Sequence, residues 1–387
     1  MAGIYIHIPF CKQACTYCNF HFTTSLRRKN ELVGALLSEI EVRKHYLDKE
    51  PIETIYFGGG TPSLLDSRDL ERLVQKIFST FSVSSGVEIT IETNPDDITE
   101  AKIKEWKAGD VNRLSVGVQS FFEEDLRWMN RAHTAKEAVQ SLELAMKYFD
   151  NITIDLIYGM PSLTNEKWKR NVDRTIALGI PHLSCYALTV EPKTPLEKMI
   201  RTHKATNVNP DHQSEQFLLL MQWMNDAGYE HYEISNFAKP GFRSRHNSSY
   251  WHGEKYIGIG PSAHSFDKIS RQWNVSNNHI YMDSIKKGIV PCEKEILTPV
   301  QKLNEYIMTS LRTIEGLDLS RLMDTSLIHE LEIASRKFVE RGLMIEDNSH
   351  LRLTKNGKLI ADGIAAELFF DGEITQSYTE GEYYKES

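Results

Sequence analysis

The chain has 387 residues, of which 41% are hydrophobic and 25% charged, a composition typical of a globular protein with a sizeable core. Its net charge of −8 disfavours a general nucleic-acid binder, because such a protein needs a basic surface for the phosphates. No apolar run is long enough for a membrane-spanning helix, and the N-terminus MAGIYIHIPF does not resemble a signal peptide. We therefore expect a cytoplasmic protein whose five cysteines are metal ligands or free thiols rather than disulfides.

Six strand-like segments recur along the first two-thirds of the chain, each followed by a helix-like stretch. Their Val, Ile and Tyr content favours strands, and they are too short for helices. They are GIYIHI (3–8), TIYFGGG (54–60), VEITIET (87–93), RLSVGVQ (113–119), NITIDLIYG (151–159) and HLSCYALTV (182–190). A helix is predicted over residues 66–81, where apolar side chains recur at helical spacing after Asp66 or Ser67 as the cap. The alternation predicts an α/β fold of parallel strands, closed as an open doubly wound sheet or as a complete or partial barrel.

The pattern changes after about residue 200. A helix is expected over residues 212–228, followed by a polar loop over residues 237–266. Beyond residue 297 helix-like segments lead to a strand, a turn, a strand and a helix, much like the wing of a winged-helix domain. The expected parts are a core of the barrel type (1–235), a linking segment (236–296), a winged-helix-like domain (297–370) and a frayed polar tail (371–387).

Three cysteines, Cys11, Cys15 and Cys18, follow the first predicted strand at C-x3-C-x2-C spacing. Each iron of a cubane iron–sulfur cluster takes one outside ligand, so three thiolates would leave one iron open for another molecule. The spacing alone also allows a zinc site completed by His7 or His21, or thiols that bind no metal. Cys185 and Cys292 stand apart and are expected to be structural thiols.

Polar or flexible residues mark the ends of the predicted strands. The segment FGGGTP (57–62) allows close backbone approach to a ligand, but it lacks the Gly-Lys-Ser/Thr of a phosphate loop. Glu92, Gln119 and Asp155 lie at or near the ends of the next three strands. Singly, each could be a cap or a turn residue. In a parallel α/β fold these ends converge on one face, so together with the cysteines they indicate one pocket.

The cysteine motif followed by GGGTP resembles the radical S-adenosylmethionine superfamily. More narrowly, YIHIPFC, FGGGTPS, IETNP, GVQSF, NRAH and DLIYGMP resemble the group of oxygen-independent coproporphyrinogen III oxidases, which includes a haem-chaperone branch. The resemblance extends over most of the chain. It implies a partial (β/α)6 TIM-like barrel with a [4Fe–4S] cluster on Cys11, Cys15 and Cys18, and S-adenosylmethionine as the chelator of the open iron.

The same resemblance implies which residues contact S-adenosylmethionine. The backbone of the glycine segment and Glu92 would bind the α-ammonium of this ligand, and Arg131 would meet a carboxylate. Gln119 and Asp155 would hold hydroxyls or other polar atoms. The implied contacts are Tyr5, Gly59, Gly60, Thr61, Glu92, Gln119, Arg131 and Asp155.

Three features favour the haem-chaperone branch over the oxidase. The oxidase has a further cysteine two places after the third, where this chain has Phe20, and it has an N-terminal extension that this chain is expected to lack. The segment HNSSYW (246–251) matches the H-N-x-x-Y-W motif of the chaperone branch, although a lone histidine is more often a surface residue. The implied haem-binding residues are His246 as axial ligand, Asn247, and Tyr250 and Trp251 against the porphyrin, with Arg243, Arg245 or Lys255 near the propionates.

We therefore expect a haem chaperone that binds haem as cargo and transfers it to apo-acceptor proteins. The alternative is a radical decarboxylase of coproporphyrinogen III, and a zinc-stabilised docking protein is a more distant one. The expected partners are haem, haem-acceptor apoproteins and a reductant for the cluster, and a homodimer is left open. Nucleic acid and a stable membrane span are not expected.

Overall fold

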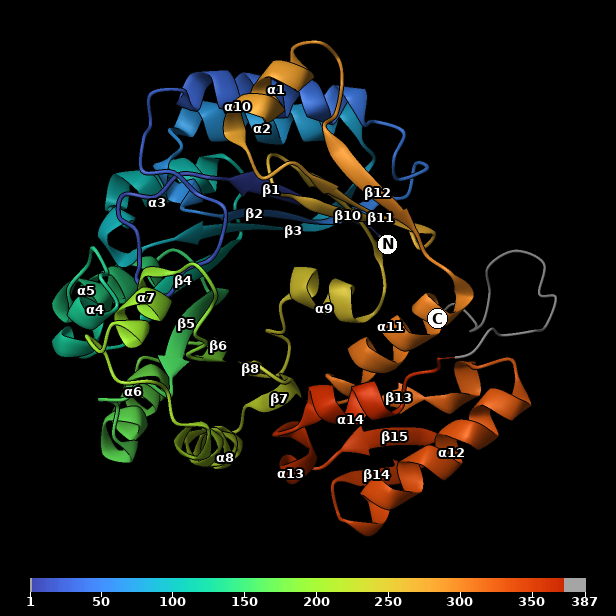
Figure 1. Ribbon diagram of the computed structural model, residues 1–387. Coiled ribbons are helices and arrows are strands. Elements are labelled where there is room, and N and C mark those ends of the chain that lie inside the picture. Colours follow the sequence, from blue (N-terminus) through green and yellow to red (C-terminus); the bar gives the residue numbers. More distant parts are fainter. Residues whose placement is uncertain (1, 372–387) are drawn as a thin grey trace.

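The computed structural model describes residues 2–371, and six parallel strands in sequence order form the centre of the fold (Figure 1). Each strand pairs in parallel with the next, as the sequence predicted. The strands are β1 (Ala2–Ile8), β2 (Ile52–Gly59), β3 (Val83–Thr93), β4 (Arg113–Gln119), β5 (Ile152–Tyr158) and β6 (His182–Ala187). Because β1 and β6 pair with other strands rather than with each other, the barrel is partial.

Helices cover the convex side of this curved sheet (Figure 1). They are α1 (Lys29–Val42), α2 (Ser67–Thr80), α3 (Glu100–Ala108), α4 (Glu123–Trp128), α5 (Ala135–Ala145) and α6 (Asn165–Ala177). The helix predicted over residues 66–81 is α2, and the Asp66 side chain caps it by accepting a hydrogen bond from the backbone N–H of Asp69. Leu70, Leu73 and Ile77 of α2 are buried against the sheet, as their helical spacing indicated.

The sheet continues beyond the six parallel strands on both sides and reaches twelve strands in the described part of the chain. The additional strands are β7 (Glu230–Glu233), β8 (Asn236–Ala238), β9 (Lys255–Ile259), β10 (His264–Phe266), β11 (Ser270–Asn274) and β12 (Cys292–Ile296). Residues 236–296, expected as a linking segment, thus supply five strands of the main sheet. The helices of this region are α7 (Pro195–Arg201), α8 (Pro210–Asp226), α9 (Arg245–Trp251) and α10 (Asn278–Ile285), and α9 lies on the concave side (Figure 1).

A buried carboxylate, Glu39, fixes these later strands to α1. Its oxygens accept hydrogen bonds from the Gly260 backbone N–H at 2.8 Å, the Tyr281 hydroxyl at 2.5 Å and the Asn274 amide at 2.7 Å. Burial raises the pKa of Glu39, and the nearby Arg43 and these three donors act against that shift. A buried polar group is stable only when such partners are present, so residues 260–281 are held in one position against α1.

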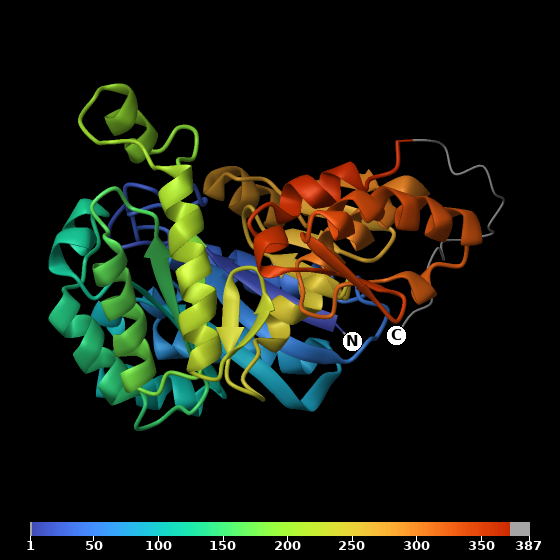
Figure 2. The same ribbon diagram turned by 90° about the horizontal axis from the view of Figure 1, so that it is seen from below.

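The C-terminal residues form a second hydrophobic cluster and are winged-helix-like, as predicted. A three-stranded sheet in the order β13-β15-β14 packs with helices, and the domain lies at one side of the barrel (Figure 2). The elements are α11 (Pro299–Leu311), β13 (Leu317–Asp318), η3 (Leu319–Arg321), α12 (Thr325–Glu340), β14 (Met344–Asp347), β15 (His350–Leu353), α13 (Lys355–Lys358) and α14 (Ala361–Glu367). The predicted polar tail, apart from Asp371, lies outside the described residues.

Ion pairs join this domain to the barrel. Arg312 contacts Glu233 at 2.9 Å, and Arg271 of β11 contacts Glu305 of α11 at 3.0 Å. No helix among residues 2–371 has the length and apolar character needed to cross a bilayer.

Candidate functional site

Two cavities adjoin inside the molecule, because Asn19 and Phe20 line both of them. We call the first, of about 520 Å³, the cysteine cavity, since Cys11, Cys15 and Cys18 lie in its wall. We call the second, of about 590 Å³, the aromatic cavity, after its tyrosine, tryptophan and phenylalanine side chains. Both are large enough for a small organic ligand or cofactor.

The cysteine cavity brings together ten of the eleven residues that the sequence assigned to the cluster and S-adenosylmethionine. They are Cys11, Cys15, Cys18, Gly59, Gly60, Thr61, Glu92, Gln119, Arg131 and Asp155. Tyr5 is the exception, because its side chain lines the aromatic cavity. The loops that follow β1 to β5 converge here, as expected for a site at the carboxyl ends of parallel strands.

Backbone contacts hold the cysteine loop in place. The N–H of Cys11 donates to the Thr23 carbonyl at 3.0 Å, and the N–H of Thr16 donates to the Met129 carbonyl at 3.1 Å. All three thiols are half-buried. Burial raises the pKa of Cys11 to about 11 and also raises that of Cys18, so cluster assembly on these thiols must displace protons.

The histidines proposed to complete a zinc site make other contacts. The Nε2–H of His7 donates to the His21 carbonyl at 2.9 Å, so its Nδ1 accepts from the Tyr5 hydroxyl at 3.1 Å. The Nε2 of His21 lies 2.7 Å from Oδ1 of Asn278. Among the described residues, no group of three or more His, Cys, Asp and Glu side chains is arranged to hold a single metal ion. The fixed histidine contacts disfavour the zinc alternative, while the thiols of a cubane bind separate irons.

Arg131 lies next to the cysteines with its charge turned into the cavity. It donates to Asn94 Oδ1 and to the Gly117 carbonyl, both at 2.6 Å, and approaches Cys15 Sγ at 3.4 Å. Its Nε is buried and has no hydrogen-bond partner among the described residues. A buried donor of this kind is costly unless a ligand satisfies it, which fits an anionic or polar group bound beside Cys15.

Two buried carboxyl groups give the cavity its acidic side. Glu92 accepts hydrogen bonds from the Tyr56 hydroxyl at 2.8 Å and from the Gly59 N–H at 3.1 Å. Burial raises the pKa of Glu92 to about 7, and these two donors act against that shift. Burial, together with the charge of Glu92, also raises the pKa of Asp155 to about 7. A cationic ligand would favour the ionised form of both groups.

The glycines of FGGGTP serve chain packing as well as the cavity. Gly59 has a φ of +107°, which favours glycine, and a Cβ at Gly60 would lie 2.6 Å from the Phe10 carbonyl oxygen. Gln119 also has a positive φ, +68°, at the end of β4. Such backbone strain in a non-glycine residue is typical of functional sites, and this one turns Gln119 into the cavity wall.

These features fit the groups that the resemblance implies. Three half-buried thiols on one loop suit an iron–sulfur cluster, and the buried carboxyls and Arg131 suit a ligand with an ammonium and a carboxylate. The sequence reasoning did not single out Asn94, which accepts from Arg131 and donates to Thr61 Oγ1 at 3.2 Å. Its place directly after β3, two residues beyond Glu92, is the signal that could have identified it.

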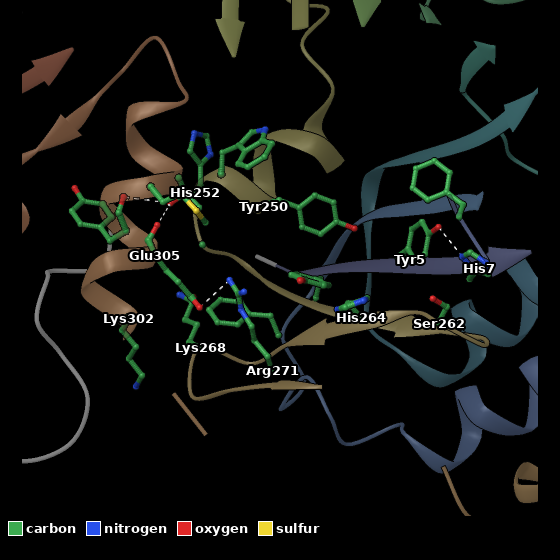
Figure 3. A pocket seen from close by; sticks show the side chains of 18 of the residues that line it. Tyr5, His7, Tyr250, His252, Ser262, His264, Lys268, Arg271, Lys302 and Glu305 are labelled. Atoms are coloured by element: carbon green, nitrogen blue, oxygen red, sulfur yellow. Dashed lines mark hydrogen bonds and ion pairs between the residues drawn. The ribbon is translucent and has the colours of Figure 1, made fainter. Parts of the chain in front are cut away.

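The aromatic cavity lies between the sheet and α11. Figure 3 shows side chains from β1, α9, β10, β11 and α11 around it. Tyr250 and Trp251 of the predicted haem motif line this cavity, and the guanidinium of Arg312 packs over the Trp251 ring at 4.8 Å. An aromatic wall beside basic side chains suits a flat amphipathic ligand.

His246 and Asn247, the other two motif residues assigned to haem, do not line the aromatic cavity. His246 is 1% exposed, and its ring nitrogens lie 2.8 Å from Thr54 Oγ1 and 2.8 Å from the Tyr250 hydroxyl. Asn247 lies on the same helix, α9, outside the cavity wall. Because both ring nitrogens of His246 are engaged, this arrangement does not favour it as a metal ligand.

The basic side chains near the aromatic cavity also differ from those expected. Arg243 pairs with Glu315 at 2.7 Å, Arg245 pairs with Glu53, and Lys255 pairs with Glu50 at 2.7 Å. None of these three cations lines the aromatic cavity. The basic side chains that do are Lys268, Arg271 and Lys302. The first two belong to the β10–β11 hairpin, which lies in the predicted linking segment (236–296).

Comparisons with known proteins agree with this geometry. The profile of the radical SAM superfamily matches residues 5–175, and that of the HemN C-terminal domain matches residues 297–360. The chain is 33% identical over 371 residues to the heme chaperone HemW of Bacillus subtilis, covering 94% of this chain and 98% of that protein. It is 30% identical over 377 residues to the heme chaperone HemW of Escherichia coli, covering 95% and 97%.

Among solved structures, the coproporphyrinogen III oxidase HemN of Escherichia coli has the same fold. The TM-score is 0.82 at 23% identity, and the alignment covers 95% of this chain and 90% of that one. Membership of the radical SAM superfamily implies a [4Fe–4S] cluster and S-adenosylmethionine, and the cysteine cavity fits both. The chain belongs to the HemW family, a branch of the radical SAM superfamily related to HemN.

Proposed function

We propose that the protein is a haem chaperone, which binds haem in the aromatic cavity and transfers it to apo-acceptor proteins. The observation that supports this most is the cavity itself, which has Tyr250 and Trp251 of the family motif in its wall and Arg271 and Lys302 beside them. The names of the curated relatives, which match over nearly the whole chain, support the same function.

The cysteine cavity would hold the cofactors of the superfamily. Cys11, Cys15 and Cys18 would bind the cluster, and Glu92 and Arg131 would orient S-adenosylmethionine by its ammonium and carboxylate. When bound, the two groups supply one-electron reductive chemistry at the sulfonium. The chain contributes orientation and exclusion of water.

The other residues assigned to S-adenosylmethionine remain predictions. Gly59, Gly60, Thr61, Gln119 and Asp155 line the cysteine cavity and are proposed as contacts of S-adenosylmethionine. Tyr5, also predicted to contact this cofactor, lies apart from these five residues, because it lines the aromatic cavity. A reductant for the cluster, a homodimer and a cytoplasmic location are also proposals.

The alternative function is oxidative decarboxylation of coproporphyrinogen III. The shared fold with HemN favours it, although at 23% identity the likeness concerns the fold alone. Phe20, which is 68% exposed, occupies the position where the resemblance places the additional cysteine of the oxidase. Phe20 also lines both cavities, so this difference from the oxidase motif lies between the proposed cofactor site and the proposed haem site.

Anaerobic reconstitution with iron and sulfide, followed by two parallel assays, tests the proposal. The first titrates the protein with haem, follows the Soret band, and then measures transfer to an apo-haem protein. The second supplies coproporphyrinogen III, S-adenosylmethionine and a reductant and measures decarboxylated product. We expect stoichiometric haem binding, transfer, and no product. Efficient decarboxylation without haem binding would establish the oxidase instead.

A further inference from the structure

A chaperone that holds haem by its iron needs an axial ligand in the cavity wall, and histidine is a common one. Four histidines line the aromatic cavity: His7, His21, His252 and His264. His246, the motif histidine, is absent from this wall. The question is which of the four can present a ring nitrogen to a bound iron.

Contacts make His7 and His21 poorer ligands, and His252 lies at the end of a short helix. Both ring nitrogens of His7 are hydrogen-bonded, to the Tyr5 hydroxyl and the His21 carbonyl. His21 is bonded through Nε2 to Asn278 and lies on the cysteine loop, so its position is tied to that loop. His252 follows the last turn of α9 and also lines a smaller pocket.

His264 differs from His7 and His21 in its freedom, and from His252 in its support by a paired strand. The His264 side chain makes no hydrogen bond or ion pair to any residue in the described part of the chain, and the residue is exposed. It stands on β10, which pairs with β9 and β11, and its ring stacks near that of Trp273 at a centroid distance of 6.3 Å. A ligand on a paired strand is held more rigidly than one on a loop or at a helix end.

The face of the sheet that carries His264 also carries the other groups a haem needs. Side chains two residues apart on a strand share a face, and directly paired residues lie next to each other on it. Phe266 is therefore on the face of His264, and its cross-strand partners Tyr256 and Arg271 are on it as well. The alternate residue, Ser265, points away and is bonded to Arg43 at 3.0 Å.

The basic side chains are placed toward the α11 side of the cavity. In the view of Figure 3, His264 lies between Tyr5 on one side and Arg271 on the other, with Lys268 and Lys302 beyond Arg271. Arg271 contacts Glu305 through one terminal nitrogen, and its buried Nε has no hydrogen-bond partner among the described residues. That arrangement leaves a donor for a carboxylate, such as a propionate.

We propose that His264 is the axial ligand of the haem iron in the aromatic cavity, and that His246 is a positioning residue. This inference rests on the proposed function. His246 holds the Tyr250 hydroxyl at 2.8 Å and stacks on Tyr56 at a centroid distance of 4.9 Å, so it sets the place of an aromatic wall residue. Burial lowers the pKa of His246 to about 3, which keeps the ring neutral in that position.

The test compares His264→Ala with single alanine variants of His21, His246 and His252, with exposed His329→Ala on α12 as a matched control. Each reconstituted protein is titrated with ferric haem, and magnetic circular dichroism and electron paramagnetic resonance report the iron ligand. For His264→Ala we expect loss of the histidine-ligand signature and an affinity lower by about tenfold or more. Added imidazole should restore the signature in that variant but not the wild-type affinity.

Retention of the histidine-ligand signature in His264→Ala, with its loss in one of the other three variants, would overturn the assignment. His246→Ala should keep the signature even if its affinity falls, because it acts through Tyr250. If unmodified protein binds no haem at all, the proposed function fails rather than the ligand assignment. Because the His264 side chain is exposed, circular dichroism and S-adenosylmethionine binding should show an intact fold in the decisive variant.

Discussion

The Tyr56 hydroxyl donates a 2.8 Å hydrogen bond to the buried carboxylate of Glu92. The Tyr56 ring stacks on His246, and His246 is in turn hydrogen-bonded to Tyr250 in the wall of the aromatic cavity. A continuous set of contacts therefore runs from the acidic side of the cysteine cavity to the wall of the aromatic cavity. Such contacts are a physical route for coupling, although coupling itself must be measured.

Replacement of Tyr56 by Phe tests the first step of this route. The variant keeps the ring that stacks on His246 but removes a hydrogen bond to an ionised carboxylate, which is typically worth about 1.5–3 kcal/mol. Affinity for S-adenosylmethionine should fall about tenfold or more at neutral pH. Calorimetry on reconstituted protein measures it. An unchanged affinity would show that Glu92 does not contact the ligand in ionised form.

The pH dependence of S-adenosylmethionine binding should follow Glu92. Burial raises the pKa of this group from 4.5 to about 7, so in the ligand-free protein it is mostly protonated below that pH. The α-ammonium favours the ionised form, so binding at lower pH must release the proton. Affinity should therefore rise by at least about tenfold per pH unit up to about pH 7 and level off above it.

Calorimetry in buffers of different ionisation enthalpy checks the released proton directly. The variant Glu92→Gln should bind weakly and show a flatter profile, while Asp155, whose pKa is also raised to about 7, retains part of the slope. A flat profile from about pH 5.5 to about pH 8 in unmodified protein would contradict the role of Glu92.

The cluster prediction concerns the three cysteines of one loop. Anaerobically reconstituted protein should hold about four irons per chain, and replacement of Cys11, Cys15 or Cys18 by Ser should abolish the thiolate-to-iron absorption. Cys292→Ser is the matched control, because that exposed thiol lies outside both cavities. Stoichiometric zinc without labile sulfide, after purification in the absence of oxygen, would refute the cluster.

Gly60 should affect both cofactors together. Its Cβ would lie 2.6 Å from the Phe10 carbonyl oxygen, so Gly60→Ala must displace the backbone just before Cys11. Iron content and S-adenosylmethionine affinity should both fall. Gly86→Ala is the matched control, because nothing lies within 4 Å of the added methyl group. Full iron loading of Gly60→Ala would mean that the loop adapts to the substitution.

The sequence predicted the parallel strands because each one is a short, largely buried segment that a helix-like stretch follows. It did not predict β10 and β12. Only one residue pair, Phe266 with Tyr256, joins β10 to β9, and every residue of β12 is exposed. Neither has an apolar pattern of its own, so both depend on the sheet already formed beside them.

The two cavities also differ in how far the sequence predicts them. The cysteine cavity is predictable because its residues are chemically distinctive and lie at successive strand ends, which parallel topology brings together. The aromatic cavity gathers Tyr5, Tyr250, Arg271 and Lys302 from segments far apart in the sequence. The motif identified the residues of α9, but not that His246 faces β2 while Tyr250 reaches the cavity. That orientation depends on Thr54, which no local pattern relates to residue 246.

The structural role of His246 can be tested in haem-free protein. His246→Ala removes a buried ring and leaves the Tyr250 and Thr54 hydroxyls without their partner, so it should lower the free energy of unfolding by about 2–4 kcal/mol. Since Tyr56 loses its stacking partner, affinity for S-adenosylmethionine should also fall severalfold in haem-free protein. Urea denaturation and calorimetry measure the two effects, with surface His329→Ala as the control. Stability within about 0.5 kcal/mol of the unmodified protein would show that His246 is not a structural residue and would return it to consideration as an iron ligand.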